Sequence, residues 1–263
     1  MTLADDRYIV SNTLSEGWLD AVRAVYSVPN GKLVHLLVRI LDPTVELVDI
    51  REHAQWLIDE WNSTHAESRH LYDVESTRNT IFPAAWASRN PEPEDLAGYY
   101  RDRYTRDGLL SFNNNNRGTY FGRIVAYPRA VGQEPGDQLS STVRKLRNEI
   151  RGGRPKSSRY EINIYCERLD TSPMSFPCLA HLSVHLHQRK LHMQAVYRNE
   201  YLVGRAYGNY LGLAELQRYM ARASGLEVGE LMITIGHIEL DGSKRAVGNM
   251  LASLAPPRDS GQP

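Results

Sequence analysis

The stretch between Pro177 and Gly236 constrains the fold most, because strand and helix patterns follow one another there without a linker. Apolar residues alternate after Cys178, which predicts a strand. A turn-rich passage then leads to Asn209 and to a helix that ends at Gly225, and a last strand is predicted over 232–235. Strands and a helix packed into one short stretch favour an α/β or α+β domain.

Three residues of this stretch are candidates for chemistry. Cys178 lies between a proline and a strand, at an element boundary where its sulfur can face a cleft. Arg198 can bind an anion or keep a nearby thiol ionised. Asn209, at the N-terminal end of the helix, can cap it or read an amide-like ligand edge. The alternative for Cys178 is a small buried hydrophobe.

The length and net charge of the chain limit the number of domains and the kinds of partner to be expected. The chain has 263 residues and a formal net charge of zero, which suits one large domain and gives no electrostatic reason for a nucleic-acid or membrane partner. Cys166 and Cys178 make no disulfide framework, so a reducing cytoplasm is expected. We find no secretory signal and no apolar run long enough to span a bilayer.

The remaining pattern predicts a single domain over 1–253 and a polar, disordered tail over 254–263. Ser11 or Asn12 is available to cap the first helix. The polar tract 113–116 is predicted to be a loop tip. We expect helices over 13–26, 50–61 and 137–150, strands over 32–41 and 160–166, and an excursion of helix and loop over 89–104.

Histidines gather on the strand after Cys178. His181, His185 and His187 share one face of it, since side chains alternate along a strand. A His-x-His pair can bind zinc, but it needs a third ligand and supporting hydrogen bonds. We favour a polar sheet face in a subunit interface and predict no metal site.

Cys178, Arg198, Asn209 and the run Gly225–Gly229, in this order and spacing, resemble the catalytic half of thymidylate synthases and related pyrimidine-nucleotide hydroxymethylases. The resemblance implies an α+β fold with a large mixed sheet. Helices would cover one face of the sheet, and the other face would pack against a second subunit in a homodimer. It covers residues 157–236 well and the first half of the chain loosely.

The resemblance also implies a reaction and its residues. A thiolate of Cys178 would add to carbon 6 of a pyrimidine nucleoside monophosphate and activate carbon 5 for methyl or hydroxymethyl transfer. Arg198, and Arg159 from the partner subunit, would bind the 5′-phosphate, and Asn209 would read the base. Asn199 stands where the family has the serine of an Arg-Ser pair. His237 stands near the family's sugar-binding residues, and Tyr120 matches a segment of the active-site wall.

The folate half of the site is altered. The family's cofactor is 5,10-methylenetetrahydrofolate, and Trp86 matches an aromatic residue placed over it, the equal alternative being an ordinary core aromatic. Tyr201 stands where the family has an aspartate that holds the pterin, so an unchanged folate mode is not expected. Glu52 approximates the family's catalytic glutamate with the acid displaced by one place, and its alternative is a solvated carboxylate in the first turn of a helix.

Several functions stay open on this pattern. The substrate is UMP, dUMP or CMP, with uracil preferred because an asparagine matches N3–H and O4 of that base. Folate-independent chemistry at carbon 5, decarboxylation or dehalogenation, would use the same Cys178. A degenerate homologue that only binds a nucleotide is the third alternative.

Overall fold

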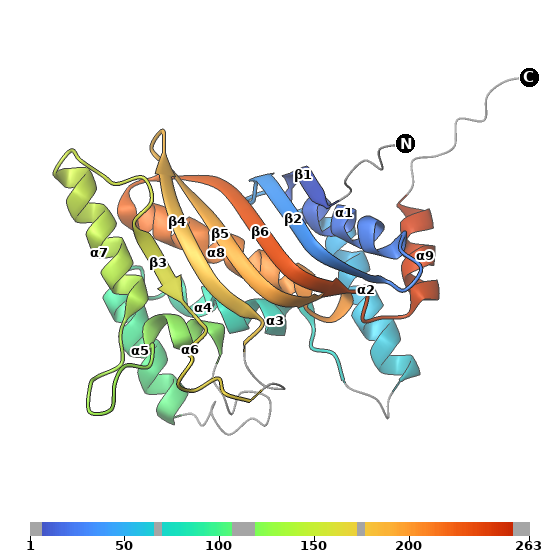
Figure 1. Ribbon diagram of the computed structural model, residues 1–263, viewed down its shortest axis with the longest axis horizontal. Helices are drawn as coiled ribbons and strands as arrows, with labels where there is room; N and C mark the ends of the chain where they lie inside the picture. Colours follow the sequence, from blue (N-terminus) through green and yellow to red (C-terminus); the bar gives the residue numbers. More distant parts are fainter. Residues whose placement is uncertain (1–6, 66–69, 107–118, 173–176, 255–263) are drawn as a thin grey trace, which may run out of the picture.

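A mixed six-stranded sheet forms the centre of the fold (Figure 1). The structure is a computed structural model, which describes residues 7–65, 70–106, 119–172 and 177–254. β1 is parallel to β2 and β6 is parallel to β5, whereas the other neighbours are antiparallel. In order across the sheet, the strands are β1 (Tyr8–Thr13), β2 (Lys32–Asp42), β6 (Glu227–Glu239), β5 (Lys190–Tyr201), β4 (Leu179–His187) and β3 (Tyr160–Asn163).

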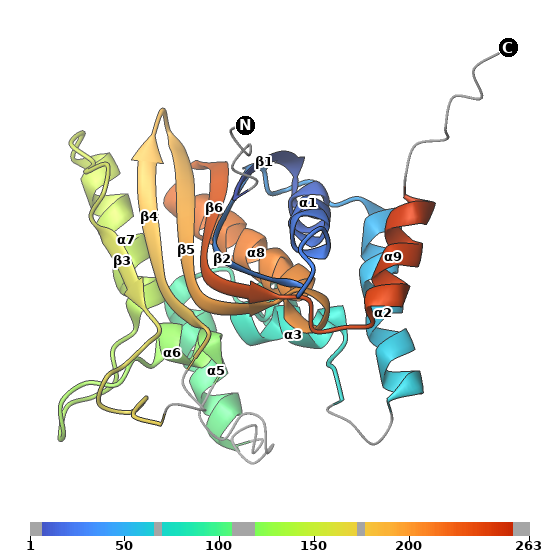
Figure 2. The same cartoon turned by 45° about the vertical axis from the view of Figure 1, so that its right-hand side comes forward.

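One long helix, α8, runs behind β5 and β6 in both views (Figures 1 and 2). A π-helical turn, η2, leads into it directly from β5. This mixture of sheet and helices confirms the predicted α+β class. The helices are α1 (Leu14–Tyr26), α2 (Val48–Thr64), α3 (Val74–Ile81), α4 (Ala84–Ala87), α5 (Pro93–Arg106), α6 (Tyr120–Val125), α7 (Gln138–Arg151), η2 (Leu202–Ala206), α8 (Tyr207–Ser224) and α9 (Lys244–Ser253).

The core lies between the sheet and α8. Along β5, Leu191, Met193 and Ala195 are buried while the residues between them stay partly exposed, as expected for a strand with one covered face. Two glycines let α3 lie close against α8. A Cβ at Gly208 would stand 2.7 Å from the backbone oxygen of Val74, so any larger residue would push the two helices apart.

The opposite face of the sheet carries partly exposed polar side chains. Arg39 of β2 forms an ion pair with Glu230 of β6 at 2.7 Å. Gln194 donates a hydrogen bond to Thr234 on the same face. The homodimer predicted above would bury this face, and it stays a prediction. No helix within the described residues is long and apolar enough to cross a membrane.

Several element boundaries differ from those predicted, and α2 extends beyond 50–61 at both ends. Thr13 rather than Ser11 or Asn12 caps α1, because β1 continues to Thr13, whose hydroxyl accepts from Glu16 N. The strand predicted over 160–166 ends at 163, since the carboxylate of Asp170 binds Cys166 N and folds the segment into a turn. The last strand is longer than 232–235 and covers all of β6. The loop tip at 113–116 and the tail from 255 onward lie outside the described residues.

Candidate active site

Cys178 stands immediately before β4 and is partly buried. Its backbone oxygen accepts a hydrogen bond from Arg198 N at 2.9 Å, which joins the start of β4 to the end of β5. The Nε of Arg198 also donates to the backbone oxygen of Pro177 at 3.3 Å. Two of the predicted site residues, Cys178 and Arg198, are therefore neighbours across one pair of strands.

Tyr120 adds a phenol to this corner. The hydroxyl of Thr119 caps α6 by accepting from Gly122 N, so Tyr120 is the first residue of that helix. Burial raises the pKa of Tyr120, and the nearby Cys178 and Glu200 raise it further. The phenol consequently keeps its proton at neutral pH and can donate a hydrogen bond to an anion beside it.

A buried polar pair lies next to Cys178 and Tyr120. Asn209 Nδ2 donates to Glu200 Oε1 at 2.7 Å, and both residues are almost fully buried. Burial raises the pKa of the Glu200 carboxyl to about 8, although the hydrogen bond from Asn209 lowers it. Glu200 Oε2, Asn209 Oδ1 and the hydroxyls of Tyr197 and Tyr210 have no hydrogen-bond partner among the described residues. We call these four residues the buried polar cluster.

The π-helical turn η2 carries the chain from Glu200 to Asn209. Asp241 accepts hydrogen bonds from Val203 N at 2.8 Å and Gly204 N at 3.2 Å, which satisfies backbone donors at the start of the turn. Trp18 Nε1, from α1, donates to Leu202 O at 2.9 Å. π-Helical turns occur often at functional sites, and this one places Asn209 next to a residue nine positions earlier.

Asn199 and His237 form a second polar contact at the end of the sheet. His237 Nδ1 lies 2.7 Å from Asn199 Oδ1, across the parallel pairing of β5 and β6. Because Asn199 directly follows Arg198, this pair extends from the same corner as Cys178. Both residues are only partly buried, so they remain available to a ligand.

Arg159 lies far from Cys178 within one chain. It precedes β3, where Tyr160 is in register with Val184 of β4, and its Nη1 binds Glu149 at 2.8 Å. The separation from Cys178 along β4 is roughly 20 Å at about 3.3 Å per residue. That distance exceeds the reach of an arginine side chain, so Arg159 and Cys178 of the same chain do not share a site.

The two residues predicted to contact folate lie in different surroundings. Trp86 packs its ring against Tyr99 and Tyr100, with centroids 5.5 and 5.4 Å apart. Tyr201 ends β5 in register with Glu239, and that carboxylate is paired with Lys32 at 2.7 Å. Neither position offers a free carboxylate to a pterin ring.

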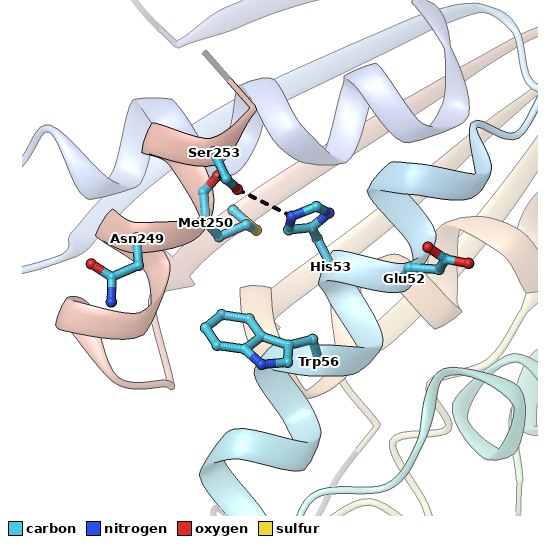
Figure 3. A pocket seen from close by; sticks show the side chains of 6 residues that line it. All are labelled: Glu52, His53, Trp56, Asn249, Met250 and Ser253. Atoms are coloured by element: carbon cyan, nitrogen blue, oxygen red, sulfur yellow. Dashed lines mark hydrogen bonds between the residues drawn. The ribbon is translucent and has the colours of Figure 1, made fainter.

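Glu52 is exposed on α2 and lines a hollow of about 390 Å³ between α2 and α9 (Figure 3). Within it, His53 Nε2 lies 3.1 Å from Ser253 Oγ. No residue of the corner around Cys178 lines this hollow. Its lining residues are Glu52, His53, Trp56, Asn249, Met250 and Ser253.

The comparison with protein families agrees with this geometry. A family model described as thymidylate synthase matches residues 37–243, which is most of the chain. The chain therefore belongs to the thymidylate synthase family, a family of transferases that modify carbon 5 of pyrimidine nucleotides. No individual curated protein matches the chain significantly.

Sequence reasoning missed Glu200, Tyr197 and Tyr210. The available signal was a glutamate two positions after Arg198 that is followed directly by Tyr201, Leu202 and Val203. A strand end is often solvated, so burial of this carboxyl depended on how η2 returns the chain over it. Among the described residues, no group of three or more His, Cys, Asp or Glu side chains is able to hold a metal ion.

Proposed function

We propose that this protein modifies carbon 5 of a pyrimidine nucleoside monophosphate, with Cys178 as the nucleophile. The observation that carries the proposal is the position of Cys178, tied to Arg198 and lying beside Tyr120 and the buried polar cluster. The thiolate forms a bond to carbon 6, and the electron pair of the C5–C6 double bond moves to O4 as an enolate. Carbon 5 then becomes a nucleophile.

The surrounding residues take complementary roles. Arg198 binds the 5′-phosphate, since guanidinium groups bind phosphate oxygens through charge-assisted hydrogen bonds. Asn209 contacts the base, because its Oδ1 has no partner within the part of the chain that the structure describes, while its Nδ2 is held by Glu200. Asn199 and His237 face the sugar, where a hydroxyl can both donate and accept. Tyr120 stabilises negative charge beside the sulfur.

Arg159 completes the phosphate site of a partner subunit in a homodimer. Its separation from Cys178 within one chain supports this sharing, because the side chain cannot reach its own nucleotide. The open, partly polar face of the sheet is the surface that the two subunits would bury.

Methylenetetrahydrofolate is the usual cofactor of the family, but Tyr201 replaces the residue that holds its pterin there, so the family's binding mode is not kept. A pterin edge with several N–H donors needs an acceptor, and Tyr201 offers one hydroxyl where the family has a carboxylate. The carboxylate in register with it, Glu239, is held by Lys32. We therefore derive no step through folate. Decarboxylation or dehalogenation at carbon 5 would use the same adduct at carbon 6.

The adduct itself provides the test. A 5-fluoropyrimidine nucleotide, incubated with the protein, should increase the mass of the intact chain by one nucleotide. Cys178→Ala should abolish this mass increase, and Cys166→Ala, the matched control, should retain it because Cys166 is buried in a turn away from the base. Incubation with and without methylenetetrahydrofolate then separates one-carbon transfer from folate-independent chemistry.

An adduct that survives in Cys178→Ala would refute the proposed nucleophile. Nucleotide binding without any adduct in the wild type would support the degenerate homologue instead. Cys178→Ala should leave the fold intact, since it removes a single sulfur from a partly exposed position.

A further inference from the structure

The bond between Asn209 and Glu200 directs one end of the amide away from the ligand. Nδ2 donates to Glu200 Oε1, which leaves Oδ1 as the amide atom that has no partner among the described residues. An asparagine amide can be turned by half a revolution with little change in shape, which exchanges its donor and its acceptor. What holds the amide in one orientation therefore decides what it offers to a base.

We propose that Glu200 is a positioning residue that fixes the orientation of the Asn209 amide and thereby sets the choice between uracil and cytosine nucleotides. The inference rests on the proposed function, since it assigns a role to a neighbour of the base-reading residue. It differs from that function in naming a carboxyl group for which the sequence pattern suggested no role.

The two protonation states of Glu200 hold the amide differently. A carboxylate only accepts hydrogen bonds, so it keeps Nδ2 on its own side and leaves Oδ1 for the N3–H of uracil. A protonated carboxyl can donate to Oδ1, which turns Nδ2 toward the ligand and matches the bare N3 of cytosine. The charge on one buried group is thus transmitted to the edge of the base.

Burial brings the pKa of the Glu200 carboxyl into the pH range in which enzymes work, so the group can change its protonation state there. The pKa of Glu200 is about 8, raised chiefly by burial and further by Asp241, and lowered by Asn209 and Arg205. Below this pH the carboxyl is mostly neutral and above it mostly charged. The titratable groups that act on this site come from several elements: Tyr120 from α6, Cys178 before β4, Tyr197 from β5, Arg205 from η2, Tyr210 from α8 and Asp241 after β6.

The unpaired atoms of the buried polar cluster indicate a ligand-facing role. Native proteins pair nearly all of their buried polar atoms with protein or ordered water. Here Glu200 Oε2 and Asn209 Oδ1 are both buried, and neither has a hydrogen-bond partner in the described ranges 7–65, 70–106, 119–172 and 177–254. A purely structural link between β5 and α8 would need only the single bond at 2.7 Å.

The test compares UMP with CMP by calorimetric titration of the full chain from about pH 6 to about pH 9. In the wild type, the ratio of the affinity for UMP to that for CMP should rise at least about tenfold as Glu200 ionises, because one base loses a matched hydrogen bond and the other gains it. Glu200→Gln has no titrating group here, so its ratio should change with pH only as far as the free nucleotides titrate. The variant also corrects for titration of the bases themselves.

Glu215→Gln is the matched control. Glu215 is also a carboxyl whose pKa is raised by burial and which lies on α8, but it pairs with Arg78 outside the buried polar cluster. This variant should keep the pH-dependent ratio of the wild type. A wild-type ratio that does not change with pH, or an unchanged dependence in Glu200→Gln, would overturn the role of Glu200.

The wild-type titration tests the role of Glu200 in base selection even if Glu200→Gln fails to fold. Binding of both nucleotides with a constant ratio removes this inference and leaves the proposed function standing. If the wild type binds neither UMP nor CMP, and neither of the corresponding deoxynucleotides, both the proposed function and this inference are overturned.

Discussion

Arg123 and Asp170 form a bidentate ion pair that is almost fully buried, with Nη2–Oδ1 and Nη1–Oδ2 distances of 2.8 and 3.1 Å. The same carboxylate accepts a hydrogen bond from Cys166 N at 2.8 Å. One acidic side chain thus anchors both α6, which carries Tyr120, and the turn that follows β3.

Removing that anchor should destabilise the fold. Asp170→Asn removes the carboxylate that pairs with the buried guanidinium of Arg123 and accepts from Cys166 N, so the free energy of unfolding should fall by about 3–5 kcal/mol. Urea unfolding followed by circular dichroism measures this loss. Lys32→Met, which breaks an ion pair with a lysine side chain 54% exposed, should change stability by less than about 1 kcal/mol. Equal losses in the two variants would contradict the structural role assigned to Asp170.

Arg159 should act in trans. Arg159→Ala alone should weaken nucleotide binding at least about tenfold, because a charge-assisted hydrogen bond to phosphate is lost. When Arg159→Ala and Cys178→Ala subunits are mixed, each mixed dimer regains one complete site. Random pairing then restores up to about a quarter of the wild-type activity. Activity that stays absent after subunit exchange, verified by mass spectrometry, argues against a shared site.

Glu52 should be dispensable for turnover. Its side chain is exposed in the hollow between α2 and α9, which no residue of the corner around Cys178 lines. Glu52→Gln is therefore expected to retain turnover within about twofold, as surface substitutions usually perturb a protein little. A loss of more than about a hundredfold in turnover with unchanged nucleotide affinity would restore Glu52 as the catalytic acid.

Glu200 should make the protein less stable as the pH rises. Its pKa is raised from 4.5 to about 8 in the folded chain, so between these values the folded state holds a proton that the unfolded state has lost. Stability is then fully present below about pH 4.5 and decreases as the pH rises toward 8, by on the order of 3–5 kcal/mol. Urea midpoints of the ligand-free protein should show this slope, and Glu200→Gln should lack it. Parallel profiles for the two proteins would show that Glu200 does not titrate in this range.

The large elements were predictable because their local patterns agree with the fold. Trp18, Leu19 and Val22 recur at helical spacing and are buried in α1, and Gly225 ends α8 in the left-handed conformation that glycine favours. The polar helix α3 was not predicted, since its sequence buries only a few side chains and depends on Gly208 of α8 for a close approach.

The candidate site was predictable only where the chain keeps a family motif. Cys178 and Arg198 are neighbours across one strand pair, as their spacing indicated. The bond between Asn209 and Glu200 could not be read from the pattern, because a π-helical turn has no sequence signature that reveals which side chains it brings together. Whether Glu200 was solvated or buried depended on that turn.

The order of strands in the sheet affects how the chain folds while it is synthesised on the ribosome. β6 pairs with β2 on one side and with β5 on the other, so in the described part of the sheet β1 and β2 join the other strands only through a strand that ends at Glu239. During synthesis, β1 and β2 emerge early and keep an unpaired edge until most of the polypeptide has been translated. Pairings between such distant residues slow folding. Chaperones that shield exposed strand edges should therefore bind nascent chains that stop short of β6, and should release those that include it.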